Sequence, residues 1–378
     1  MNTFWQENIL ILITLFGIIQ GIILALVVLF YPERDRNSNS LLATFIITAV
    51  IILMAPLLQY IIGWKHVWVF HCIKFITISS LYLYIRSLTA AIKPSRMLKH
   101  FSFAVAYIPV AVAYVYYIAE KYEVDYIYEG GQDPYDVIIS LSNLLYIAFY
   151  FVLYYRAYQD HRKNILANFS YLNRLGLHWI KQLILGFLFT IIVSYAMFAY
   201  ILSAPEFSTT ACLLNMAAIT VFLYFVTIRG KISPEVYKLR TLLEQNKTDA
   251  APATQKTLEE KTVSDELKNI ADKVVKAMEE HEYYKNENLS IKELGEALEI
   301  QPYLVSQAIN TVLEKSFYDL VNTYRVEYAK RLLADKSADK YSLVGIGFES
   351  GFNSKTTFNT TFKKVTGLTP SAYKRQYS

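Results

Sequence analysis

Cysteine, metal-binding patterns and catalytic motifs are scarce in this chain. Its only cysteines, Cys72 and Cys212, both lie inside apolar runs of the 378-residue sequence. We expect buried free thiols there rather than a disulfide, although the two could pair. The six histidines are scattered without a second ligand pair nearby, so no metal site is predicted. No Walker phosphate loop or nucleophile elbow occurs, and we therefore predict neither an enzyme nor a cofactor.

Charge is also scarce. Charged residues make up 18% of the chain and hydrophobic residues 54%, above the roughly 45–50% apolar share of soluble proteins. The apolar excess lies within residues 8–228, and the sequence beyond Gly230 is as polar as an ordinary cytosolic domain. We predict a membrane domain at residues 1–230 and a helical linker at 231–281 with a flexible polar segment at 246–261. A helical C-terminal domain follows at 282–378.

Seven apolar stretches approach the ~20 residues that cross ~30 Å of hydrocarbon. They are residues 9–30, 41–62, 68–91, 101–119, 137–158, 180–202 and 211–228. The first stretch lacks the positive flank and cleavage site of a secretory signal, so it counts as a span. The predicted fold class is therefore all-α, with a seven-helix transmembrane bundle followed by a cytoplasmic helical domain.

Basic residues in the connections predict the orientation of this bundle. The second connection holds Lys65 alone, the fourth is acidic apart from Lys121, and the sixth has no basic residue. Alternate connections are therefore basic, which places the N-terminus outside and the C-terminal domain in the cytoplasm. The basic residues of the first, third and fifth connections are Arg34, Arg36, Lys93, Arg96, Lys99, Arg162, Lys163 and Arg174.

Three polar residues within the predicted spans are candidate sensor residues, namely Lys74, Asn143 and Asn215. A charge inside a bilayer is costly and for that reason often functional. The alternatives are that Lys74 extends to the nearer interface and that the two amides form hydrogen bonds between helices. No ligand is identified by these residues.

One helix of the linker is predicted at residues 263–281. Its apolar residues fit either a dimer stripe or packing against the C-terminal domain. They cover only two heptads, whereas a stable coiled coil needs three or four, so packing is favoured.

Two helix-turn-helix modules are predicted in the last ninety residues. In the first, Ser290 and Glu293 form a capping box, and Leu294, Ala297 and Leu298 supply the buried face. A turn with a proline at residue 302 leads into a helix over residues 303–312. The residues on the outer face of that helix are Tyr303, Ser306, Gln307 and Asn310.

A long helix, residues 318–334, connects the first module to the second module. There Gly351 supplies a left-handed turn residue and Ser354 caps a helix that buries Phe358 and Phe362. Asparagine can bond adenine with two hydrogen bonds, and lysine suits phosphate or guanine, so the opposite face is typical of a DNA-reading helix. That face carries Lys355, Thr356, Asn359, Thr360 and Lys363.

The second module contains the sequence IGFESGF at residues 346–352 and ends with FKKVTGLTP at residues 362–370. With Tyr324-Arg325 and the AKRLL sequence at residues 329–333, this stretch resembles the DNA-binding domain of the AraC/XylS family of bacterial transcription regulators. The resemblance implies that both reading helices enter successive major grooves. It departs from the usual pattern at Gln301, Glu314 and Gly347, where serine, glycine and alanine are usual. The base-facing positions that it implies are Tyr303, Ser306, Gln307, Lys355, Thr356, Asn359 and Thr360.

With seven spans, the whole chain is similar to membrane-bound members of that family from Bacteroidetes-type bacteria. The resemblance implies a transcription regulator in the inner membrane that binds double-stranded promoter DNA, contacts RNA polymerase and senses an unknown ligand or partner. A homodimer is compatible with it. Two alternatives remain, a transporter-like or enzyme-like membrane domain with a DNA-binding reporter, and a membrane–chromosome tether. Proteolysis in segment 246–261 is a further hypothesis for release of the DNA-binding domain.

Overall fold

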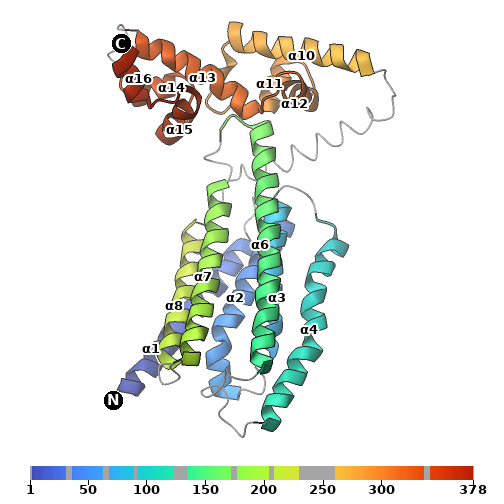
Figure 1. Ribbon diagram of the computed structural model, residues 1–378, viewed down its shortest axis with the longest axis vertical. Coiled ribbons are helices and arrows are strands. Elements are labelled where there is room, and N and C mark those ends of the chain that lie inside the picture. Colours follow the sequence, from blue (N-terminus) through green and yellow to red (C-terminus); the bar gives the residue numbers. More distant parts are fainter. Residues whose placement is uncertain are drawn as a thin grey trace. The chain divides into compact units, whose positions relative to one another are not determined.

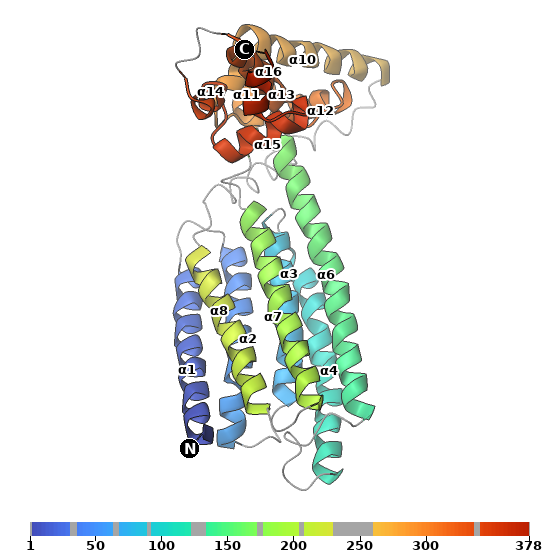
Figure 2. The ribbon, with the colours of Figure 1, turned by 60° about the vertical axis from the view of Figure 1, so that its left-hand side comes forward.

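A computed structural model describes residues 2–30, 36–62, 68–88, 92–121, 134–171, 177–203, 208–229, 260–335 and 341–377. The described residues are helical, with no β-strand among them beyond one isolated bridge. The chain forms two compact units, residues 1–159 with 178–237, and residues 160–177 with 238–378 (Figure 1; Figure 2). The all-α prediction is confirmed. The acidic fourth connection and the polar segment 246–261 lie almost entirely outside the described residues.

The first unit is built from long helices that occupy all seven predicted stretches. In chain order, neighbours pack on one another from α1 to α4, and α8 returns to α1. The helices are α1 (Asn2–Leu29), α2 (Arg36–Ile62), α3 (Trp68–Ser87), α4 (Pro94–Lys121), α6 (Pro134–Asn168), α7 (Leu177–Ser203) and α8 (Ser208–Arg229). Helix α6 belongs to the first unit up to residue 159 and to the second unit from residue 160.

Three of these helices contain a described stretch that is both long and apolar enough to cross a membrane. The stretches are Ile11–Leu29, Arg36–Met54 and Leu177–Met197, and a shorter apolar stretch is Leu214–Val226. The seven-span prediction is therefore supported only in part. Helix α3 carries Lys74 and Arg86, and α4 and α6 are rich in tyrosine. Tyrosine lowers the mean hydropathy of a helix, although it suits a membrane interface.

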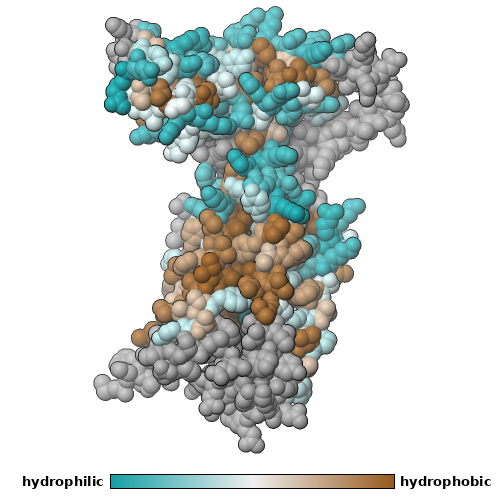
Figure 3. All heavy atoms as spheres, viewed as in Figure 1, coloured by the Kyte–Doolittle hydropathy of each residue, from teal (hydrophilic) through white to brown (hydrophobic). Residues whose placement is uncertain are grey.

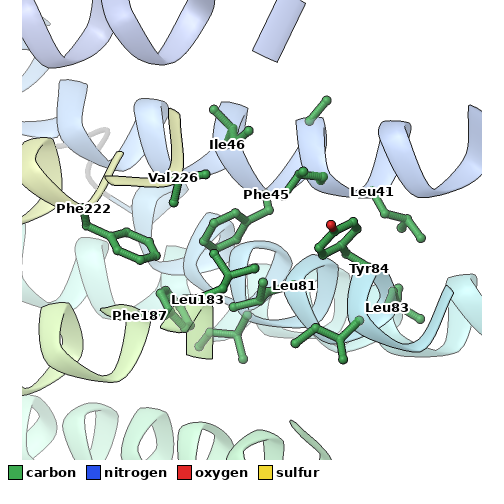
Figure 4. Packing of buried hydrophobic residues seen from close by; sticks show 14 of the residues in the cluster. Leu41, Phe45, Ile46, Leu81, Leu83, Tyr84, Leu183, Phe187, Phe222 and Val226 are labelled. Carbon is green, nitrogen blue, oxygen red and sulfur yellow. The ribbon is translucent and has the colours of Figure 1, made fainter. Parts of the chain in front are cut away.

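Aromatic rings hold the centre of the first unit together. Phe45 of α2 meets Phe187 of α7 and Phe222 of α8 edge-on, with ring centroids 5.4 and 6.3 Å apart (Figure 4). Edge-to-face contacts of this kind add to the free energy gained from burial. Hydrophobic residues also cover much of the described outer surface of this unit, whereas polar residues dominate the visible surface of the second (Figure 3). Cys72 is a buried free thiol, as predicted.

The second unit contains the two predicted helix-turn-helix modules and the helix before them. Its helices are α10 (Glu260–Glu280), η4 (Tyr283–Lys285), α11 (Ile291–Leu298), α12 (Pro302–Thr311), α13 (Phe317–Ala334), α14 (Leu343–Glu349), α15 (Lys355–Thr366) and α16 (Pro370–Tyr377). The capping box is confirmed, because the Ser290 hydroxyl accepts from the Glu293 amide and the Glu293 carboxylate from the Ser290 amide.

Two hydrophobic cores divide the second unit, and α13 runs through both. Leu320 and Val321 of α13 lie in the first core, with α10, α11 and α12. Val326 and Leu333 lie in the second core, with α14 and α15. The prediction that residues 263–281 pack on the DNA-binding modules is confirmed, since the apolar face of α10 is buried in the first core. Ala297 is exposed, so its predicted burial was wrong.

The three departures from the AraC/XylS pattern each have a visible consequence. Gln301 is the N-cap of α12 and makes no side-chain capping hydrogen bond, which the usual serine would supply. Glu314 has a left-handed backbone with φ of 51°, a conformation that glycine adopts more readily. At Gly347 an added Cβ would lie 2.7 Å from the ring of Phe358, so the glycine admits that ring.

Gly351 is where the second module meets the first. Its φ is +89°, and an added Cβ would lie 2.4 Å from the carbonyl oxygen of Tyr284 in η4. Gly367, the C-cap of α15, has a similar φ of +78° but nothing within 4 Å of an added Cβ. The two glycines therefore share one backbone requirement and differ in the space around them.

We predict that Gly351→Ala destabilises the second unit by about 2–5 kcal/mol, because a left-handed alanine costs about 1–2 kcal/mol and the overpacking adds about 1–3. The matched control Gly367→Ala bears only the first cost. Urea unfolding of the purified chain, followed by fluorescence, measures both. Equal destabilisation by the two variants would contradict a tight contact at Gly351.

Candidate nucleic-acid interface

Helix α12 presents the first set of predicted DNA-reading residues. Val305, Ala308 and Ile309 are buried and fix the orientation of the helix. On the opposite side, the predicted residues Tyr303 and Ser306 are half-buried and Gln307 and Asn310 are exposed. The Asn310 amide donates to the Ser306 carbonyl at 2.8 Å, so this amide must break a local bond before its nitrogen reaches a base.

Helix α15 presents the second set. The Ser354 hydroxyl accepts from the Thr357 amide at 3.1 Å, and Phe358 and Phe362 are fully buried beneath the helix. These contacts hold one face of α15 inward. The predicted residues on its other face are all exposed, namely Lys355, Thr356, Asn359, Thr360 and Lys363.

The exposed side chains of α15 differ in whether they must break an internal hydrogen bond before they can contact DNA. The Thr360 hydroxyl donates to the Thr356 carbonyl of its own helix and must rotate to meet a base. Among the described residues, no recorded hydrogen bond or ion pair engages the side chains of Asn359, Lys355 or Lys363. Asparagine and lysine side chains of this kind can enter a major groove without first breaking internal contacts.

Charge distinguishes the two reading helices. Helix α15 carries three lysines and no acidic residue, whereas α12 carries no charged residue at all. Because lysines supply most of the salt-dependent attraction to phosphate, the second module offers the stronger electrostatic contact.

One lysine of α15 has a structural role that the sequence did not indicate. Lys364 donates to the Asp319 carboxylate of α13 at 2.9 Å, and the Ser316 hydroxyl donates to the same carboxylate at 2.8 Å. Burial raises the pKa of Asp319, but these hydrogen bonds and the charges of Lys364 and Arg162 outweigh it and leave the pKa below its ordinary value. The bond is present at neutral pH and is lost as the pH falls through that lowered pKa. Both side chains are substantially exposed, so the pair orients α15 more than it stabilises the fold.

Helix α13 sets the distance between the two reading helices. Its 18 residues span about 27 Å at ~1.5 Å per residue. One turn of B-DNA is ~34 Å, so a helix of this length suits two reading helices in successive major grooves.

The three candidate sensor residues are not brought together by any recorded contact among the described residues. Lys74 is exposed on α3, and Asn143 is half-buried on α6. Asn215 of α8 accepts a hydrogen bond from the Ser194 hydroxyl of α7 at 2.7 Å. That bond joins two helices, which is the alternative role that the sequence allowed for this residue.

A polar cluster in the first unit was not predicted from the sequence. The Ser79 hydroxyl lies 2.7 Å from the Tyr146 hydroxyl and donates to Tyr150 at 3.0 Å, and the Tyr150 hydroxyl lies 2.8 Å from Nδ1 of His100. The cluster ties α6 to α3 and α4. Serine and tyrosine at separated positions carry no spacing signal, so only the packed helices show that these residues meet.

Comparison with known proteins agrees with the C-terminal geometry. Residues 294–376 match the family described as "Helix-turn-helix domain". An uncharacterized HTH-type transcriptional regulator of Staphylococcus aureus (strain COL) is 31% identical over 103 residues, which are 27% of this chain and 13% of that protein. An uncharacterized HTH-type transcriptional regulator of Pseudoalteromonas carrageenovora is 36% identical over 76 residues, 20% of this chain and 42% of that protein.

These matches concern the second unit. This chain matches less than half the length of each of the two relatives, and no solved structure matches it significantly. The C-terminal part of the chain is a helix-turn-helix domain of the AraC type, and the relatives that it matches are named as transcriptional regulators.

We predict that Asn359→Ala and Lys363→Ala weaken DNA binding in different ways. The first removes a base contact and relaxes preference at one base-pair position by about 1–3 kcal/mol. The second removes a phosphate contact, so it weakens all sequences alike and reduces the salt slope by about 1. Binding of a set of single-position DNA variants at several salt concentrations measures both effects. An unchanged base preference in Asn359→Ala would exclude that residue from base reading.

Proposed function

We propose that this chain is a membrane-embedded, sequence-specific transcription regulator that couples a membrane or extracytoplasmic signal to promoter binding. One observation carries the proposal. The same chain contains two helix-turn-helix modules with exposed reading residues and helices that are apolar enough to cross a bilayer. A soluble regulator has no use for such helices.

The proposed location is a bacterial inner membrane, with all seven helices of the first unit as spans. The N-terminus lies outside and the second unit in the cytoplasm. Support comes from the basic residues of the first, third and fifth connections, because positive charge favours the cytoplasmic side. This arrangement places the reading helices in the compartment that holds the chromosome.

The exposed residues of α12 and α15 support double-stranded promoter DNA as the proposed ligand. RNA polymerase is proposed as a protein partner because the resemblance to AraC/XylS regulators implies it. The membrane helices serve as sensor or anchor and perform no catalysis in this proposal. A homodimer would place two copies on paired sites.

We predict that the full chain, purified in lipid nanodiscs, enriches a shared motif from genomic DNA fragments. The double variant Lys355→Ala/Asn359→Ala should lose that motif, because it removes two base-facing side chains from α15. Sequencing of the bound fragments measures the enrichment and identifies target promoters.

The matched control for this selection is Lys276→Ala. Lys276 is exposed on α10, outside both reading helices, and its loss should leave the motif unchanged. A folded chain that enriches no motif would contradict sequence-specific binding. Enrichment of DNA without any effect on transcription from those sites would favour a membrane–chromosome tether, and substrate flux in vesicles would favour a transporter.

The proposed topology makes a separate prediction. The chain should stay in the membrane pellet after a carbonate wash, because several apolar helices resist extraction. In intact cells with a permeabilised outer membrane, protease should remove an N-terminal tag and leave a C-terminal tag intact. Immunoblots of the two tags measure this, and a cleaved C-terminal tag would contradict the proposed orientation.

A further inference from the structure

Residues 169–171 lie in the connection between α6 and α7, yet they are buried in the second unit. Phe169, Ser170 and Tyr171 are 3%, 0% and 8% exposed. Connections between helices normally lie on the surface, because their backbone groups need water or other partners. Here the partners come from the DNA-binding modules.

The backbone of this short segment pairs with the residues just before α11. Phe169 forms an antiparallel bridge with Ser290, the N-cap of α11. The Ser170 amide donates to the Leu289 carbonyl at 3.2 Å, and the Ser170 hydroxyl donates to the same oxygen at 2.7 Å. The segment therefore attaches where the first module begins.

The other side of the segment meets a buried arginine of α13. Arg325 is 1% exposed, and its Nε donates to the Tyr284 carbonyl at 2.7 Å. Its Nη1 donates to the Ser170 carbonyl at 3.0 Å and to Asn322 Oδ1 at 3.2 Å. Its Nη2 donates to the Ser170 hydroxyl at 3.0 Å and to the Asn286 carbonyl at 2.7 Å.

All five N–H groups of the guanidinium are thus occupied, and two of them end on Ser170. The Asn322 amide donates to the same Ser170 carbonyl at 3.2 Å. A buried charge needs a complete set of acceptors, and a departing partner leaves a costly unsatisfied donor. The segment therefore occupies a binding site that consists of Leu289, Ser290, Asn322 and Arg325. Ser170 supplies the hydrogen-bond partners that complete this site.

The segment is also the direct continuation of α6. Within the first unit, Tyr146 and Tyr150 of this helix are bonded to Ser79 of α3, and Tyr150 also to His100 of α4. One continuous helix, Pro134–Asn168, thus connects the polar cluster to the residue before the docked segment. Helix α6 therefore contributes residues to both units and leads directly into residues 169–171.

We propose that residues 169–171 are a docking segment that binds the DNA-binding unit at Leu289, Ser290, Asn322 and Arg325, and that this contact couples α6 to the two reading helices. The coupling rests on the proposed function, whereas the docking does not. Since α13 belongs to both cores, a change at Arg325 bears on both modules. Binding of DNA should in turn change the docking, because coupling between two sites is reciprocal.

The test uses the full chain in lipid nanodiscs and the variant Ser170→Pro. Proline removes the amide that bonds Leu289 and the hydroxyl that bonds Leu289 and Arg325. Hydrogen–deuterium exchange of peptides covering residues 284–294 should become about tenfold faster or more, since the three hydrogen bonds of the Ser170 amide and hydroxyl are lost. Affinity for the enriched promoter fragment should change by about fivefold or more.

Two further variants make the outcome specific. Ser170→Ala keeps the backbone bonds and removes only the hydroxyl, so both effects should be smaller and of the same sign. Lys163→Ala, in the exposed part of the same helix end, should leave exchange and affinity unchanged.

Each failure has its own meaning. Unchanged exchange in Ser170→Pro would overturn the docking. Faster exchange with unchanged affinity would overturn the coupling. A wild-type chain that binds no DNA would overturn the proposed function and the coupling together, while the exchange data would still decide the docking.

Discussion

The buried guanidinium of Arg325 is the contact on which the organisation of the second unit depends. Five hydrogen bonds connect it to α13, to η4 and its following residue, and to Ser170. The guanidinium carbon Cζ of Arg325 also lies 5.8 Å from the ring centre of Phe352, in the second module. Burial lowers the pKa of Arg325 to about 10, so it remains charged at neutral pH. A single charge therefore joins both modules and the docking segment, and none of its partners can leave without cost.

Around this charge, the two DNA-reading modules are arranged as one body. The Tyr284 carbonyl accepts from Arg325 and also lies against Gly351, so η4 touches both α13 and the turn of the second module. Lys364 adds an ion pair between α15 and the start of α13. The spacing of the reading helices is thus fixed by α13 and its neighbours, as a pair of successive major grooves requires.

Helix α6 gives the proposed regulator a physical route for a signal. It is bonded to α3 and α4 through Tyr146 and Tyr150, and its last residues belong to the DNA-binding unit. A rigid element with two alternative arrangements is what a coupling mechanism needs. In the proposed mechanism, docked and released states of residues 169–171 are these two arrangements.

The sequence by itself determined the local structure: seven long helices, the Ser290–Glu293 capping box, the turn at Gly351 and the exposed face of Lys355 and Asn359. These features follow from apolar periodicity, capping and turn chemistry, which act over a few residues. Only the tertiary structure decided the bonds of Arg325 to Ser170, 155 positions away, the Lys364–Asp319 pair, and the Ser79, Tyr146 and Tyr150 cluster. Such contacts depend on which elements pack together, and a polar residue read alone does not reveal its distant partner.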